Sequence, residues 1–545
     1  MCSERRGENG EWNRQWSSEH RMPSDASPRC KARASARVLP TWQPSRYTFN
    51  AGPTKPGRDG EVDIYRSVCS SSWKALQCLL IHHGIPTDAE DLTSTLGDHH
   101  HWGRAEWVER GYILCICWPS CSAARGRKGT CRGMDIVLER KYGYSGLREA
   151  QIGAGLQITP NASKIFQQFG IYDELEAKAA EPSFLQVRRY SDGKVLSRTD
   201  DFNGDMKKKY GAAFWDLHRV DVQRALAERA KQLGTEIRFG ARVADIDFDK
   251  PSVKLENGEE LQADLLVAAD GIWSKCRERF LASKGKSDVP LPTGDLAYRI
   301  VLTLDEVDDP ELREWIAKPS CQFWVGPGSH VVAYSLRDGH MFNIVLLVPD
   351  DLPDNVARQA GSIDEMRQLF TSWDPVLNRF LDQVKSVDKW KLMHRPELDS
   401  WISDKSNFVF IGDSCNPMLP YLAQGANSSM EDGAVLGNVL AALEAKSQLP
   451  EALRLYERLR KKRGEAIVRE TFAQRRDFHM NDGPEQQARD ELMLSQLGKQ
   501  QIECKFPSRW QCPEVQPWLY GYDAQKETDA ALRESPFSKV SQAAL

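Results

Sequence analysis

The sequence predicts an α/β fold with an inserted antiparallel sheet and C-terminal helices. Three observations lead to this prediction. From residue 111 onward, short apolar runs that end in an acidic residue or in Gly-Asp alternate with amphipathic segments. Residues 292–350 alternate between apolar and polar side chains, which is typical of antiparallel strands. Residues 429–476 carry two long helical patterns.

Bulk composition limits the possible function classes. The chain has 545 residues, of which 41% are hydrophobic and 28% charged, so it is long enough for two or three globular domains. A net charge of -4 gives no reason to expect nucleic-acid binding. No run of eighteen apolar residues occurs, so we expect no membrane span. The polar N-terminus and the isolated later cysteines favour a cytoplasmic protein, whose oligomeric state the sequence leaves unknown.

Residues 1–110 differ from the rest of the chain. The opening 60 residues are rich in Arg, Ser, Pro and Trp without periodicity, so we expect this region to be disordered or not the natural reading of the gene. Eight of the 13 cysteines precede residue 134. Cys115, Cys117, Cys121 and Cys131 have no zinc-site spacing, and no metal site is predicted.

Residues 111–290 read as the first part of a nucleotide-binding α/β domain. The two predicted helices end at Gly170 and Gly234, and a hairpin turns at Asn257-Gly258. Strands are predicted at Tyr112–Cys115, Asp135–Leu138, Phe184–Arg198 (a hairpin), Glu236–Phe239, Val243–Phe248 and Leu265–Ala269, and helices at Asn161–Gln168 and Val220–Leu233.

Residues 291–395 read as a separate substrate-binding sheet domain. Its strands include Gln322–Trp324, His330–Leu336 and Met341–Leu347, and residues 365–394 read as mostly helical. Residues 396–480 return to the first domain with the helices Ser429–Ala445 and Glu451–Arg476. The tail, 481–545, carries so many aromatic side chains that we expect it to pack on the body.

The segment Val409–Ala434 is the strongest functional signal. Asp413 ends a buried strand, where a carboxylate is costly unless hydrogen-bond donors such as ligand hydroxyls surround it. The small residues Gly425 and Ala426 lie in a turn just before a helix, whose N-terminus carries partial positive charge. A helix-capping role for Asp413 is the commoner alternative. The combination suits an electron-rich ligand such as a flavin.

Four segments together resemble FAD-dependent aromatic hydroxylases, the class A flavoprotein monooxygenases, and most closely the fungal salicylate-hydroxylase-like branch. The resemblance covers roughly residues 111–525 and implies the family's FAD-binding Rossmann-like domain. Its motifs are Gly412-Asp413 with the following loop, Asp264–Arg277, Glu149–Ala162 and Trp215–Asp221.

The resemblance assigns roles by position. Asp413 would hold the ribityl chain, Arg219 would face the flavin or the pyrophosphate, and Glu139 would bind the adenosine ribose. Arg299 and Tyr334 match positions that the family uses for catalysis or substrate placement, although Tyr334 also fits plain sheet packing and Arg219 a surface helix. The remaining cofactor-binding positions are Gly153, Ala154, Gly155, Asp270, Gly425 and Ala426.

The implied reaction is hydroxylation of a small phenolic or aromatic-acid substrate, in secondary metabolism or aromatic degradation. It would use FAD, molecular oxygen and NADH or NADPH, through a flavin hydroperoxide. An epoxidase or a Baeyer–Villiger-type oxygenase on the same fold is an alternative.

One motif of the family is missing. The three glycines expected after the first strand fall on Ile116, Trp118 and Cys121, where larger side chains would fill the space of the phosphates. Two interpretations fit. In the first, residues 1–133 reflect a shifted reading frame or a wrongly spliced exon. In the second, the chain as written is a flavin-free relative that acts as a binding protein.

Overall fold

The structure, a computed structural model, describes residues 112–117, 135–139, 155–499 and 501–537. The prediction for residues 1–110 lies outside the described residues, as do the predicted cofactor positions Gly153 and Ala154. Within the described ranges, two larger sheets carry most of the chain's strands.

A five-stranded sheet forms the centre of the first part, in the order β18-β11-β1-β2-β7. Parallel pairs join β11 to β18 and β2 to β7. The apolar sequences Leu-Leu-Val-Ala of β11 and Phe-Val-Phe of β18 are buried throughout, as expected for strands covered on both faces. The strands are β1 (Tyr112–Cys117), β2 (Asp135–Glu139), β7 (Glu236–Arg238), β11 (Leu265–Ala268) and β18 (Phe408–Phe410).

β1 is unusual in its direction. Its place between β11 and β2 is as expected for the first strand of a dinucleotide-binding fold, but it pairs antiparallel with both neighbours. Cys117, its last residue, pairs with Leu265, the first residue of β11, so β1 ends where β11 begins. The sequence around the end of β1 has Ile116, Trp118 and Cys121 at the three positions where the family's glycine-rich turn has glycines.

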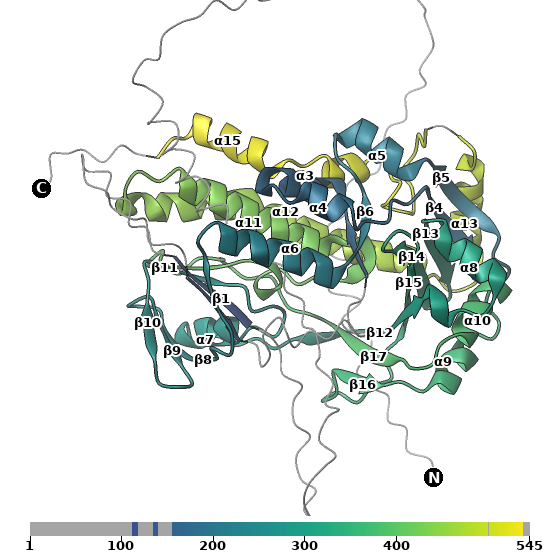
Figure 1. Ribbon diagram of the computed structural model, residues 1–545, viewed down its shortest axis with the longest axis horizontal. Coiled ribbons are helices and arrows are strands. Elements are labelled where there is room, and N and C mark those ends of the chain that lie inside the picture. Colours follow the sequence, from purple (N-terminus) through teal and green to yellow (C-terminus); the bar gives the residue numbers. More distant parts are fainter. Residues whose placement is uncertain (1–111, 118–134, 140–154, 500, 538–545) are drawn as a thin grey trace, which may run out of the picture. The chain divides into compact units, whose positions relative to one another are not determined.

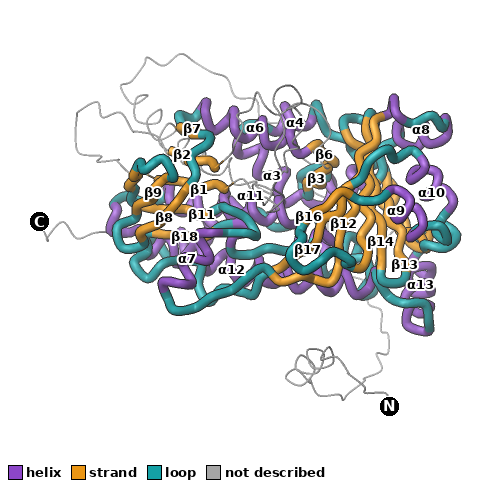
Figure 2. Tube along the Cα trace, turned by 90° about the horizontal axis from the view of Figure 1, so that it is seen from below, coloured by secondary structure: helices purple, strands orange, loops and turns teal. Residues whose placement is uncertain are grey.

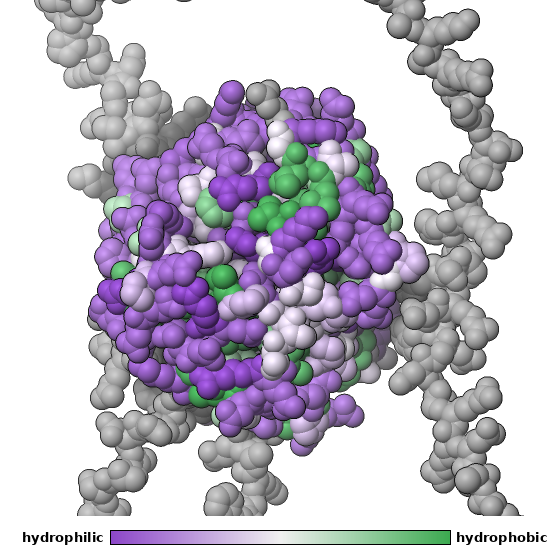
Figure 3. Space-filling model, turned by 90° about the vertical axis from the view of Figure 1, so that its right-hand side faces the viewer, coloured by the Kyte–Doolittle hydropathy of each residue, from purple (hydrophilic) through white to green (hydrophobic). Residues whose placement is uncertain are grey.

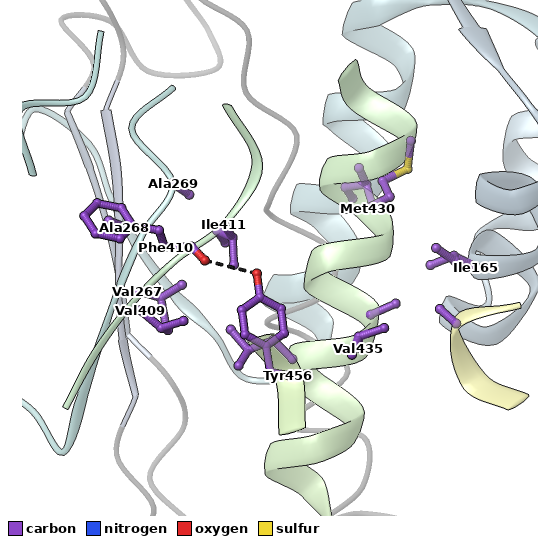
Figure 4. Close-up of a cluster of buried hydrophobic side chains, with 14 of the residues drawn as sticks. Ile165, Val267, Ala268, Ala269, Val409, Phe410, Ile411, Met430, Val435 and Tyr456 are labelled. Atoms are coloured by element: carbon purple, nitrogen blue, oxygen red, sulfur yellow. Dashed lines mark hydrogen bonds between the residues drawn. The ribbon is translucent and has the colours of Figure 1, made fainter. Parts of the chain in front are cut away.

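Helices cover one face of this sheet (Figure 1). Figure 4 shows Met430 and Val435 of α11 between Ile165 of α3 and the sheet residues Val267 and Val409. The Tyr456 hydroxyl of α12 donates to the carbonyl oxygen of Phe410 at 3.0 Å, which ties α12 to β18. The helices of this part are α3 (Pro160–Phe169), α4 (Tyr172–Glu176), α6 (Arg219–Gln232), α11 (Gln424–Ala441) and α12 (Leu449–Phe478).

A smaller sheet and one helix cover the other face. Phe280 of α7 and Phe248 pack edge-on against Phe410 and Phe408 of β18, with ring centroids 5.1 and 4.9 Å apart. The predicted Asn257-Gly258 hairpin is confirmed, and Gly258 has the positive φ of 88° that such a turn requires. These elements are β8 (Val243–Asp247), β9 (Ser252–Leu255), β10 (Glu260–Gln262) and α7 (Lys275–Ser283).

An eight-stranded sheet, ordered β16-β17-β12-β15-β14-β13-β4-β5, forms the second large unit (Figure 2). It includes β4 and β5, which lie inside the range 111–290. Its strands are β4 (Phe184–Arg189), β5 (Val195–Asp200), β12 (Leu291–Thr303), β13 (Cys321–Gly326), β14 (Ser329–Leu336), β15 (Met341–Pro349), β16 (Arg358–Ala360) and β17 (Asp388–His394). Its helices are η2 (Leu304–Glu306), α8 (Pro310–Ala317), α9 (Ile363–Leu369) and α10 (Pro375–Asp382).

The prediction that residues 365–394 are mostly helical is wrong at its end, because Asp388–His394 is the strand β17. Two lysines in this strand interrupt its apolar pattern, so the sequence did not indicate a strand here. Lys389 is buried against Asp351 and Glu365, and Lys391 against Asp350, so both act as core residues with their charges paired.

The two helices predicted at Ser429–Ala445 and Glu451–Arg476 correspond to α11 and α12, but α11 ends at Ala441 rather than at Ala445. The helix expected from Ser429 begins five residues earlier, at Gln424, so the predicted turn is its first turn. The tail packs on the body as predicted, with Phe506, Trp510 and Tyr520 buried. The remaining elements are β3 (Gly155–Ile158), β6 (Trp215–His218), α5 (Phe202–Tyr210), η3 (Gly412–Ser414), η4 (Pro420–Leu422), η5 (Lys446–Gln448), α13 (Pro484–Gln496), α14 (Gln516–Tyr520) and α15 (Ala524–Glu534).

The face of the molecule in Figure 3 is mostly hydrophilic, with small separate apolar areas. Among the residues described here, no helix is long and apolar enough to cross a membrane.

Candidate active site

Asp413 lies at the carboxyl end of β18, in the short helix η3, where it is half-buried. The preceding Gly412 allows this geometry for two reasons. Its φ of +60° is left-handed, and a Cβ there would come within 2.8 Å of Ser429 Oγ on α11. The Gly412 amide donates to Asp432 Oδ2 at 2.9 Å, which fixes the loop to α11 beside Asp413.

The N-terminus of α11 faces the same region with no cap of its own. Ala423 precedes it in a left-handed conformation, and the first turn has neither a side-chain cap nor an acidic residue. Gly425 and Ala426 lie in this first turn, Gly425 half-buried and Ala426 buried. The first N–H groups of a helix have no partner within the helix and favour negative charge. The backbone here can therefore receive an electron-rich ring edge.

A buried ionic cluster holds α11 in place. Both oxygens of Glu431 accept hydrogen bonds from Arg463, Arg460 donates to Glu431 Oε2 at 2.5 Å, and Asn161 donates to Oε1 at 2.6 Å. Burial raises the pKa of Glu431, but the two arginines outweigh it and bring the pKa down to about 2. The start of α11 is thereby locked to α3 and α12.

Tyr334, on β14, lies against the start of β3. A Cβ on Gly155 would come within 2.4 Å of Tyr334 Cε2 and 2.6 Å of its hydroxyl oxygen, so only glycine admits the ring in this position. The Gly155 amide donates to Asn343 Oδ1 at 2.9 Å, and Asn343 pairs directly with Tyr334 across β14 and β15. Two side chains of the eight-stranded sheet thus contact one glycine of the cofactor half.

Arg219 and Arg299 join Tyr334 and Asp413 in one electrostatic cluster. Arg219 is the first residue of α6, directly after His218, which pairs with Gly155. Burial lowers the pKa of Arg219, while Tyr334 and Asp413 act against this shift. Burial also lowers the pKa of Arg299, to about 10, and the charge of Arg219 adds to the effect.

This cluster has an excess of positive charge. Within the described residues no carboxylate forms an ion pair with Arg219 or Arg299, and Asp413 acts on Arg219 through Coulombic attraction alone. The Arg299 guanidinium also lies 5.1 Å from the ring centroid of Trp390. Because buried cations are costly without a partner, the cluster is suited to an anionic group.

The other predicted site residues lie apart from this cluster or outside the described side chains. Asp270 is buried at the end of β11, where Ser274 and the Cys276 amide donate to its two oxygens at 2.6 and 3.0 Å. Burial raises its pKa. Glu139 is the last residue of β2, at a strand end as predicted.

The described residues fit the ribityl and ring half of a flavin. Asp413 offers a carboxylate for hydroxyl groups, the uncapped α11 backbone offers N–H donors, and Gly425 has no side chain to block a ring. The positions of the pyrophosphate half, Trp118 and Cys121 among them, lie outside the described residues.

Sequence reasoning missed two polar residues of this region. Asn343 is fully buried with its Nδ2 unpartnered, and Asp216 is fully buried with its Oδ2 unpartnered. Each stands within a strand whose pattern shows only that it is buried. The strand register, which brings Asn343 opposite Tyr334, is the information that reveals it.

Comparisons with known proteins agree with this arrangement. The model of a protein family described as FAD binding domain matches residues 148–471. The chain is 50% identical over 384 residues to the FAD-dependent monooxygenase OpS4 of Beauveria bassiana, covering 70% of this chain and 89% of that protein. It is 30% identical over 412 residues to 3-hydroxybenzoate 6-hydroxylase of Polaromonas naphthalenivorans, covering 74% of this chain and 96% of that enzyme.

Solved structures share the fold. A salicylate hydroxylase substrate complex superposes with a TM-score of 0.58 at 21% identity, covering 71% of this chain and 92% of that one. A complex of CtdE with FAD and a substrate gives a TM-score of 0.59 at 20% identity, over 71% and 90% of the two chains.

Proposed function

The chain belongs to the FAD-dependent aromatic hydroxylases, and from this premise we propose that its substrate is a small aromatic compound carrying an anionic group that Arg299 and Arg219 bind. The single observation that carries the proposal is the cluster of Arg219, Arg299 and Tyr334, in which neither guanidinium is ion-paired with a carboxylate of the residues that the structure describes.

The reaction of the family determines which groups the site must bind and orient. FAD, when bound and reduced by NADH or NADPH, activates molecular oxygen, so that one oxygen atom enters the aromatic ring and the other leaves as water. A ring with a phenolate or carboxylate substituent needs cationic partners to hold it out of water. Guanidinium groups bind such anions through paired N–H donors.

Arg299 is placed to be the principal anion partner. It projects from the middle of β12, opposite Val345, with its guanidinium near Trp390. A substrate carboxylate or phenolate beside it would neutralise the charge of the guanidinium, which is costly to bury without a partner. The name of the relative 3-hydroxybenzoate 6-hydroxylase states a carboxylate-bearing substrate, which supports the same class here.

Tyr334 orients the substrate. Burial raises the pKa of its phenol, so the group stays protonated across the physiological range and acts as a hydrogen-bond donor. Contact with Gly155 fixes the ring, so the hydroxyl has one position rather than several.

The cofactor is held by residues of the first part. Asp413 would accept hydrogen bonds from the ribityl hydroxyls, and Gly425 and Ala426 would present backbone N–H groups to the ring. We assign Glu139 to the adenosine ribose, and Gly153, Ala154, Gly155 and Asp270 to the surrounding backbone and loop contacts. The Gly155 amide already donates to Asn343, so Gly155 would contact the cofactor only through its other atoms.

The test compares aromatic acids with neutral analogues of the same shape. The purified protein with bound FAD is assayed for NADH and NADPH oxidation with hydroxybenzoates and with the matching hydroxybenzyl alcohols. We expect the acids to stimulate oxidation and to gain one oxygen atom by mass spectrometry. Equal stimulation by the alcohols, or none by any compound, would refute the proposed substrate class.

A further inference from the structure

A second acid lies buried close to Tyr334. Asp216 is in the middle of β6, has no solvent exposure, and stands directly opposite Gln157 of β3. Gln157 Nε2 donates to Asp216 Oδ1 at 2.9 Å. Among the residues that the structure describes, the other oxygen, Oδ2, has no hydrogen-bond partner, and no cation forms an ion pair with this carboxyl group.

Asp216 is connected to Tyr334 through packed side chains. The same Gln157 amide lies 3.2 Å from Cys321 Sγ, and Cys321 pairs directly with Tyr334 across β13 and β14. Gly155, two residues before Gln157, lies against the ring of Tyr334. The contacts therefore connect the Asp216 carboxyl group to Tyr334 in two ways, through Cys321 on the neighbouring strand β13 and through Gly155 on β3.

The surroundings of Asp216 favour its neutral form. Burial raises its pKa well above the ordinary value, and the single hydrogen bond from Gln157 acts against this only in part. The titratable groups that face Asp216 and Tyr334 are Cys321, whose pKa burial also raises, and Arg219 and Arg299, which lie beyond Tyr334. A neutral Asp216 adds no negative charge to compete with a substrate anion for Arg219 and Arg299.

We propose that Asp216 is a positioning residue for Tyr334 and that it acts as an uncharged carboxylic acid. Its Oδ1 holds Gln157 against Cys321, and this contact fixes the strand that carries Tyr334. When Asp216 ionises at alkaline pH, a negative charge arises beside Tyr334 and weakens binding of the substrate anion. The proposal rests on the proposed role of Tyr334 in substrate orientation.

The test uses two substitutions at Asp216 and a matched control. Asp216→Asn keeps the oxygen that accepts from Gln157 and cannot ionise, whereas Asp216→Leu removes that acceptor. Asp221→Asn is the control, because Asp221 is also buried and acidic but accepts from Arg337 at 3.2 Å rather than adjoining Tyr334. Steady-state kinetics with an aromatic acid are recorded from neutral to alkaline pH on the proteins with bound FAD.

Asp216→Asn is expected to keep wild-type kcat/KM at neutral pH and to lack the rise in KM that we expect for the wild type at alkaline pH. Asp221→Asn should keep that rise. Asp216→Leu should lower kcat/KM at all pH values by roughly tenfold, as expected for a misplaced orienting group. If Asp216→Asn is as impaired as Asp216→Leu, or keeps the alkaline rise, the proposal is overturned.

An infrared measurement separates this proposal from the proposed function. The wild type minus Asp216→Asn difference spectrum at neutral pH should contain the C=O stretch of a protonated carboxyl group. This band does not depend on turnover. If no aromatic acid stimulates the wild type, the proposed function fails, and a missing band alone would still overturn the uncharged state of Asp216.

Discussion

The ring of Tyr334 occupies the space that a side chain on Gly155 would need, with 2.4 Å between Tyr334 Cε2 and the position of a Cβ. This contact joins the substrate sheet to the cofactor half at the point where the charged cluster lies. It makes one glycine responsible for the position of the phenol that we propose orients the substrate.

Gly155→Ala should therefore displace Tyr334 and lower kcat/KM for an aromatic acid by about 10- to 100-fold, as expected for an orienting group misplaced by about 1 Å. Steady-state kinetics measure this. In a Tyr334→Leu background the same alanine should have little further effect, because the contact it disturbs is already gone. Additive losses in the double mutant would show that Gly155 acts through something other than Tyr334.

Arg299→Gln should raise KM for a hydroxybenzoate by about 10- to 100-fold, the loss typical of a charge-assisted hydrogen bond, with a smaller effect on a neutral phenol. Arg358→Gln is the matched control. Arg358 lies near the same Trp390 ring, at 4.6 Å from its centroid, but is ion-paired with Asp388 at 2.8 Å. Similar KM changes in the two variants would argue against anion binding by Arg299.

Asp413→Ala should release flavin, since it removes the carboxylate that we assign to the ribityl hydroxyls. A loss of about 10-fold or more in FAD affinity is expected for charged hydrogen bonds. Fluorescence titration of the cofactor-free protein gives the dissociation constant. Asp404→Ala, at an exposed position, serves as the control. Unchanged FAD affinity in Asp413→Ala would place the ribityl chain elsewhere.

Glu431 should make stability dependent on acid pH. Its folded-state pKa of about 2 lies below the ordinary value of 4.5, so the folded state holds the proton less tightly than the unfolded state. The stabilisation, about 3 kcal/mol, is fully present above pH 4.5 and is lost as the pH falls toward 2.

Thermal unfolding of wild type and Glu431→Gln tests this linkage. The difference in Tm should be large at neutral pH and should shrink between pH 4.5 and 2. Arg469 and Glu397 form an exposed pair at 3.0 Å, so Glu397→Gln should leave Tm almost unchanged at every pH. A pH-independent difference for Glu431→Gln would show that it stabilises by packing alone.

The sequence predicted elements wherever local signals were clear. Gly170 ends α3 in a left-handed conformation, and Asn257-Gly258 forms its hairpin, because both depend on neighbouring residues only. The early start of α11 was missed because Ala423 offers no capping side chain, and helices without one have no sequence signal. β17 was missed because the charges of Lys389 and Lys391 are neutralised by acids from elsewhere in the chain.

The site could be predicted only in part for the same reason. Arg219, Arg299, Tyr334 and Asp413 came from separate motifs, and the structure brings all four together. Asp216 and Asn343 depend on contacts across strands far apart in the sequence, which periodicity does not contain. The antiparallel pairing of β1 was likewise not predicted, because the periodicity of a strand does not encode the direction of its neighbours.

The order of strands has a consequence during synthesis. β11 can pair with its parallel partner β18 only after the strands β12 to β17 between them have been synthesised. β4 likewise can pair with its parallel partner β13 only after the residues between them have been synthesised. At typical translation rates, β11 leaves the ribosome on the order of ten seconds before β18. During that time the edge of β11 lacks its β18 partner, which leaves an apolar strand edge open to pairing with other chains.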